Sequence, residues 1–202
     1  MMTMKTLMRL KVSQFAAAAI LAAASGPAPA QTALEFNPAE TKVEFTLGDV
    51  LHTVHGTFAL KRGNLRFDPA TGVVSGELVV DATTGASGSG ARDKRMHANV
   101  LESTRFPEIV FRPDRVEGTV APQGPSKVQM HGMFGIHGAE HEIVMPLEVN
   151  AKDGVYTATA TFAVPYVKWG MKDPSNLILK VKDHVDIVIR TVARPARERT
   201  TN

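Results

Sequence analysis

The sequence predicts an all-β fold, an eight-stranded antiparallel barrel with a short helix between its third and fourth strands. Eight segments alternate apolar and polar residues with a period of two, and tight turns join most of them. No helical run is long enough to cover a parallel sheet. Eight long antiparallel strands close most simply into a barrel because closure removes the exposed edges; a two-sheet sandwich is the alternative fold.

The predicted strands have one apolar face each and occupy most of the chain. Three precede the helix and five follow it, at residues 41–47, 53–67, 73–82, 108–118, 127–136, 143–149, 156–164 and 182–192. The turns between them contain Pro or Gly, as in the Asp153-Gly154 pair. Small residues at inward positions, namely Gly132, Ala158 and Ala160, favour an interior with space for a slender ligand.

The predicted helix spans residues 92–101 and follows a Gly- and Ser-rich segment at 85–90. Met96 and Val100 lie four positions apart and form its apolar face. Pro107 prevents continuation into the next strand. We therefore expect a flexible loop and then a short amphipathic helix that acts as a lid or plug between two β halves.

The first 30 residues have the three parts of a secretory signal peptide. A basic start is followed by a short apolar core at residues 15–24 and by small residues ending at Ala30. The apolar core is about half of the ~20 residues that a membrane-spanning helix needs. We expect cleavage near Ala30, a mature domain at residues 31–202, and a periplasmic or secreted location.

Charge and cysteine content exclude several classes of protein. The whole chain carries 23 Lys and Arg against 20 Asp and Glu, a formal net charge of +3. Lys5, Arg9 and Lys11 account for this excess, so the expected mature domain is neutral and no nucleic acid is predicted as a partner. The chain has no cysteine, which excludes disulfides. The sequence leaves open a homodimer and a transient membrane contact.

Candidate catalytic and metal sites are weak. Ser87 lacks the closing Gly of a G-x-S-x-G nucleophile turn, and carboxylate pairs such as Glu140 and Glu142 flank a turn. We predict no catalytic residues and no metal, and therefore a protein that is not an enzyme. The rival hypothesis is a haem- or metal-linked periplasmic redox protein, in which five histidines would cluster. These are His52, His55, His131, His137 and His141, and their spacings do not converge.

Several separated motifs resemble one known family. They are the segment 52–58, HTVHGTF; the small-residue segment 81–93, ending in Arg92-Asp93; the strand start 104–111, TRFPEIVF; and the repeat of glycines at 132–138, GMFGIHG. Together they are similar to the YceI-like family of bacterial polyisoprenoid-binding proteins. Residues 164–170, VPYVKWG, depart from the family pattern, in which an Arg often precedes the aromatic residue.

The resemblance implies a lipocalin-like barrel whose long apolar tunnel holds a lipid tail. The expected function is a carrier for a polyisoprenoid, an isoprenoid quinone or a fatty acyl chain, with no other cofactor. The aromatic segment around Trp169 has two interpretations: it contacts a ligand at the barrel rim, or it fills the core as a plug. The residues expected along the tunnel are Phe45, Phe58, Met96, Phe111, Met130, Phe134, Met145, Ala158, Ala160, Phe162 and Trp169.

Overall fold

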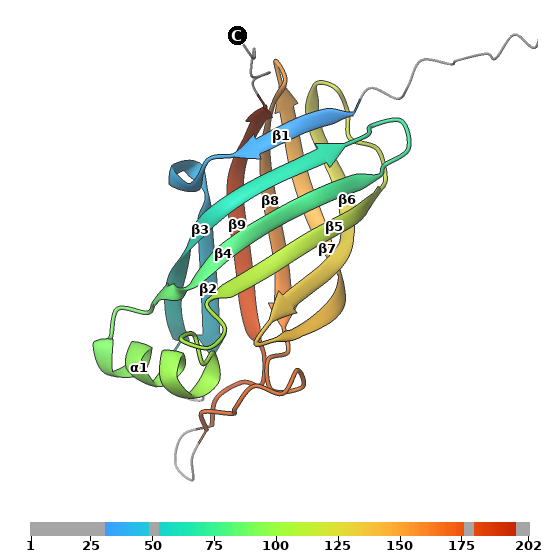
Figure 1. Ribbon diagram of the computed structural model, residues 1–202. Coiled ribbons are helices and arrows are strands. Elements are labelled where there is room, and N and C mark those ends of the chain that lie inside the picture. The colour runs from blue at the N-terminus through green and yellow to red at the C-terminus, as the bar shows by residue number, and fades with distance from the viewer. Residues whose placement is uncertain (1–30, 49–52, 176–179, 197–202) are drawn as a thin grey trace, which may run out of the picture.

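The computed structural model describes residues 31–48, 53–175 and 180–196 (Figure 1). The predicted signal peptide lies outside these residues. Strands and short helices follow one another as β1 (Thr32–Phe36), η1 (Pro38–Glu40), β2 (Lys42–Gly48), β3 (Thr53–Phe67), β4 (Val74–Ala86), α1 (Gly90–Arg95), η2 (Met96–Val100), β5 (Glu108–Glu117), β6 (Gly124–Ile136), β7 (Ala139–Lys152), β8 (Val155–Val164) and β9 (Val185–Pro195).

The strands form a closed up-and-down barrel. From β2 to β9, each strand pairs antiparallel with the next along the chain. The ring closes where β9 pairs antiparallel with β2, for example Val43 opposite Ile189. The predicted eight-stranded barrel, with its short helix between the third and fourth barrel strands, is therefore confirmed.

Strand β1 was not predicted from the sequence. It pairs with the far end of β3 and with the end of β9, so β1 and β2 together fill one position of the barrel. The 3₁₀ turn η1 separates them, and the Asn37 side chain caps it by accepting from the Ala39 N–H at 3.0 Å. Only Leu34 is buried in β1, and Asn37-Pro38 has the composition of a loop, so the five-residue strand gives almost no pattern.

The lid region differs from its prediction in detail. Its helix begins at Gly90, and its second half is a π-helical turn, η2. His97 fastens that turn: its Nε2–H donates to the Gly85 carbonyl at 2.8 Å, and its Nδ1 accepts from Ser103 Oγ at 2.9 Å. Of the residues placed by the structure, none belongs to a helix long and apolar enough to cross a bilayer.

Gly85 lies in β4 rather than in the flexible loop that its surroundings predicted. A Cβ at this position would approach the Phe58 ring to 2.5 Å and the Met96 methyl group to 2.8 Å. The glycine therefore serves close packing beneath the lid, and the strand continues to Ala86.

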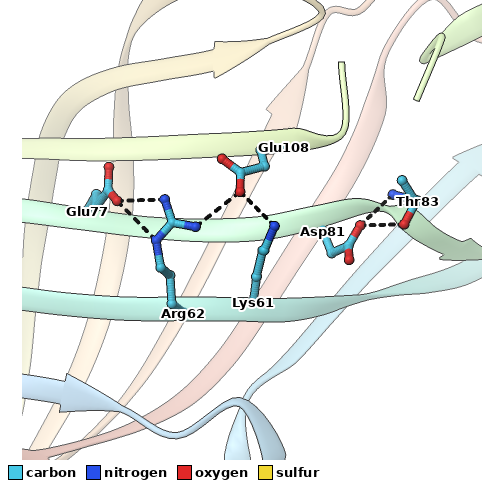
Figure 2. Close-up of polar contacts among 6 residues, drawn as sticks. All are labelled: Lys61, Arg62, Glu77, Asp81, Thr83 and Glu108. Carbon is cyan, nitrogen blue, oxygen red and sulfur yellow. Dashed lines mark hydrogen bonds and ion pairs between the residues drawn. The ribbon is translucent and has the colours of Figure 1, made fainter. Parts of the chain in front are cut away.

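A ladder of ion pairs covers the outside of the β3–β4–β5 wall (Figure 2). Glu108 accepts from Lys61 at 2.9 Å and from Arg62 at 3.1 Å, and Arg62 also donates to Glu77 at 3.0 Å. Val79 has 0% exposed surface although strand alternation places it on this outer face, opposite Arg62. The aliphatic stems of the ladder therefore bury it.

Candidate functional site

The barrel interior is open at the end nearest α1. A cavity of about 710 Å³ lies there, between the walls of the barrel, the α1–η2 segment and residues 171–175. Its walls are mainly apolar and come from strands distant in sequence, including Phe45 on β2, Phe58 on β3, Phe134 on β6, Phe162 on β8, and Ile187 and Ile189 on β9. This volume is within the range typical of small-molecule sites.

The opposite half of the interior is filled. Buried side chains such as Leu65, Met130, Met145 and Val149 belong to the apolar core and do not line the cavity. Gly132 leaves no space, because a Cβ on it would lie 2.9 Å from the Phe111 ring and 2.4 Å from the Arg112 carbonyl oxygen. The inference from this small residue was therefore wrong: the aromatic ring of the neighbouring strand occupies its place.

The structure divides the predicted tunnel residues into two groups. Five line the cavity: Phe45, Phe58, Met96, Phe134 and Phe162. The other six lie outside its lining, with Phe111, Met130, Met145 and Ala160 buried in the core and Ala158 and Trp169 packed against it. Only the first group can therefore contact a ligand inside the cavity without rearrangement.

Aromatic pairs support the cavity walls. The Phe45 and Phe58 ring centroids are 5.3 Å apart, and Phe134 meets Phe162 edge-on at 5.9 Å. Trp169 lies behind Phe134 at 5.8 Å and stacks flat on His141 at 4.0 Å. Trp169 therefore packs as a core plug and not as a ligand contact, which is the second of the two interpretations of the sequence.

Polar groups gather at the mouth. The Tyr166 hydroxyl donates to the Lys182 carbonyl at 2.7 Å. Burial, aided by the charges of Asp173 and Asp183, raises the pKa of Tyr166 to about 12, so the phenol is neutral at physiological pH. Its hydrogen bond ties the start of the β8–β9 connection to its end.

A latch of three residues fixes the start of the lid. Asp93 accepts from the Ser87 N–H at 2.9 Å and from the Ser87 hydroxyl, while Arg92 Nε donates to Ser87 Oγ at 2.7 Å. The hydrogen bond from the Ser87 side chain is the main reason why the pKa of Asp93 is lowered. Ser87 and Arg92 also line the cavity, so this latch forms one side of the mouth.

The histidines are dispersed over separate contacts. His55 bonds Thr46 at 3.1 Å, His137 bonds Glu102 at 2.6 Å, and His131 lies between Arg115 and Glu117 at 2.8 and 3.1 Å. His141 stacks on Trp169, and its Nε2 has no partner. His52 lies outside the described residues. Within residues 31–48, 53–175 and 180–196, no group of three or more His, Asp or Glu side chains is placed to hold a metal ion.

Sequence reasoning missed part of the wall and most of the mouth. Val185, Ile187 and Ile189 alternate along the predicted strand at residues 182–192, and the cavity lining includes all three. The alternation of these three apolar residues could have identified them as ligand contacts. Arg95 lines the mouth from α1, and Tyr166 and Lys172 line it from the β8–β9 connection. No alternation of apolar residues marked these three positions as cavity contacts.

Solved structures share this fold at low sequence identity. Burkholderia cenocepacia BcnA matches with a TM-score of 0.64 at 17% identity, over 78% of this chain and 98% of that one. A polyisoprenoid binding domain from Saccharophagus degradans, implicated in plant cell wall breakdown, matches with a TM-score of 0.64 at 14% identity, over 82% of this chain and 99% of that one. The YceI protein of Campylobacter jejuni gives 0.54 at 17%, over 67% and 81%.

Sequence comparison assigns the family. No curated protein sequence matches the chain. The sequence profile of the YceI-like domain matches residues 34–193, which is most of the chain and extends from β1 to the end of the barrel in β9. The chain therefore belongs to the YceI-like domain family.

Proposed function

We propose that the protein is a non-enzymatic carrier that holds one long apolar chain, such as a polyisoprenoid, an isoprenoid quinone or a fatty acyl chain, in the barrel cavity. The observation that carries this proposal is a mainly apolar pocket of about 710 Å³ beneath a short helix. The domain from Saccharophagus degradans that shares the fold is described as polyisoprenoid binding, which supports the ligand class.

The cavity volume sets how much of the ligand fits inside. At roughly 30 Å³ for each water-sized group, 710 Å³ holds about 24 carbon-sized groups, or between four and five isoprene units. Each buried methylene contributes roughly 0.8 kcal/mol, so about ten of them offset much of the cost of association. A longer chain would project its remaining carbons through the mouth.

Binding measurements with isoprenoid alcohols of increasing length test the proposal. We expect the affinity to rise with each added isoprene unit up to about four units and then to level off, because further carbons stay outside the cavity. Mass spectrometry of an organic extract of the purified protein would identify the natural ligand. Absence of both an extracted lipid and any length-dependent binding would contradict the carrier function.

We also propose that the carrier is exported and works without a metal or a haem. The three-part N-terminus supports export. The intact mass of the protein recovered from the periplasm should correspond to a chain that starts at or near Gln31. Stoichiometric metal, or a visible absorbance band in the purified protein, would instead favour the redox alternative.

A further inference from the structure

The mouth of the cavity is surrounded by basic side chains. The described segments that border it, residues 87–106, 165–175 and 180–184, contain eight Lys and Arg but only four Asp and Glu. Arg95 and Lys172 line the cavity itself. We define the basic rim as the exposed members of this set whose side chains make no hydrogen bond, ion pair or cation–π contact with described residues: Lys94, Arg95, Lys168, Lys172, Lys180 and Lys182.

The acidic residues of the same segments are engaged within the protein. Asp93 accepts from Ser87, Glu102 contacts His137, and Asp173 accepts from the Ser175 N–H at 2.8 Å. Asp183 contacts the neighbouring His184 at 2.9 Å. The rim cations make no side-chain hydrogen bond or ion pair with these carboxylates in the described structure, although the pKa of Asp173, lowered mainly by its hydrogen bond with the Ser175 side chain, is lowered further by the charge of Lys180. Their side chains are exposed beside the mouth.

The far end of the barrel has the opposite balance. Its three hairpin turns, at residues 68–73, 117–124 and 152–155, carry Asp68, Glu117 and Asp153 against a single Lys152. The counted segments at the two ends thus differ in charge, with the excess of positive charge at the end where the cavity opens.

We infer that the basic rim docks the mouth of the barrel on an anionic lipid bilayer. The inference rests on the proposed function, because a long apolar ligand resides in a bilayer and must pass through the mouth to reach the cavity. Positive side chains near an anionic membrane surface strengthen attachment by roughly fivefold each, and salt screens the attraction. Docking in this orientation places the lid helix and the Ser87–Asp93 latch at the lipid surface, where the ligand enters or leaves.

Vesicle binding by the mature protein tests the inference. Co-flotation should show binding to vesicles of phosphatidylcholine and phosphatidylglycerol, little binding to phosphatidylcholine alone, and loss of binding at high salt. The double substitution Lys94→Glu and Lys182→Glu changes two rim residues outside the cavity lining. It should weaken vesicle binding by about 25-fold or more.

A matched control reverses two exposed basic residues at the far end, Arg66→Glu and Lys152→Glu. This variant has the same net charge as the rim variant and should retain vesicle binding. Equal loss in the two variants, or equal binding of the natural protein to neutral and anionic vesicles, would overturn the docking inference. Titration with an isoprenoid alcohol in the absence of vesicles separates the two proposals: ligand binding without vesicle binding refutes docking alone, and vesicle binding without ligand binding refutes the carrier function.

Discussion

Placing a phenylalanine in each half of the barrel distinguishes the open half from the filled half. Ile187 lines the cavity between Phe45 and Phe162, its neighbours on the adjoining strands. Ile187→Phe adds three carbons to the wall and should displace about three methylenes of the bound chain. At roughly 0.8 kcal/mol each, the loss is about 2.4 kcal/mol, or about 50-fold in Kd.

Ala160→Phe is the partner substitution in the filled half. Ala160 is 6% exposed and belongs to the buried core outside the cavity lining. A phenyl ring there overpacks the core, which typically costs ~1 to 3 kcal/mol and lowers the melting temperature by roughly 2 to 12 °C in a domain of this size. Ile187→Phe should leave the melting temperature within about 2 °C, because its ring enters existing space.

The assay combines thermal unfolding with titration of an isoprenoid alcohol of about four units. The reasoning predicts opposite outcomes: weakened binding with preserved stability for Ile187→Phe, and reduced stability for Ala160→Phe. If Ile187→Phe bound the ligand as tightly as the natural protein, the assignment of the cavity would be refuted. Weakened binding by Ala160→Phe at unchanged melting temperature would place the ligand in the half that the structure shows as filled.

Three further substitutions, the first with a matched control, test individual contacts. Gly132→Ala should cost ~1 to 3 kcal/mol in chemical unfolding, because its Cβ meets backbone atoms, whereas Gly135→Ala, whose Cβ would be 3.6 Å from its nearest neighbour, should be tolerated. Tyr166→Phe should cost ~0.5 to 1.5 kcal/mol by removing the hydrogen bond to Lys182. Because the pKa of Tyr166 is raised to about 12, the natural protein should lose stability as the pH rises from about 10 to 12, and the Phe variant should lack that contribution. Asp93→Asn should accelerate amide hydrogen exchange in α1, since it removes the charged acceptor of Ser87; unchanged exchange would mean that the latch does not hold the lid.

Period-two alternation was sufficient to predict the barrel because every long strand has one face on a common interior. Val43, Phe45 and Leu47 alternate without interruption, and all three line the cavity. Strand β1 escaped prediction because it buries only Leu34 and ends at Asn37-Pro38. Its strand conformation depends on pairing with β3 and β9, which are distant in sequence.

The location of the empty space could not be predicted from residue size. Gly132 and Ala160 are small, yet both lie in the filled half, where side chains from neighbouring strands occupy the space before them. The cavity is lined instead by large residues such as Phe58 and Ile189. The packed fold decides which side chain extends from a neighbouring strand across the interior. No pattern in the sequence indicates that side chain.

Closure of the ring between β9 and β2 has a consequence for how the chain folds. Among β2 to β9, all other neighbouring strands of the ring are consecutive in sequence, but the closing pair joins Lys42 to Arg190. Until the last strand is available, β2 and β8 present unpaired backbone groups to solvent, and each is a template for pairing with another chain. Non-local pairing of this kind slows folding, so the slowest step of assembly should be the docking of the C-terminal strand. The C-terminal strand β9, which completes the barrel, therefore also protects it from self-association. The nascent chain is most prone to pair with another chain immediately before β9 docks.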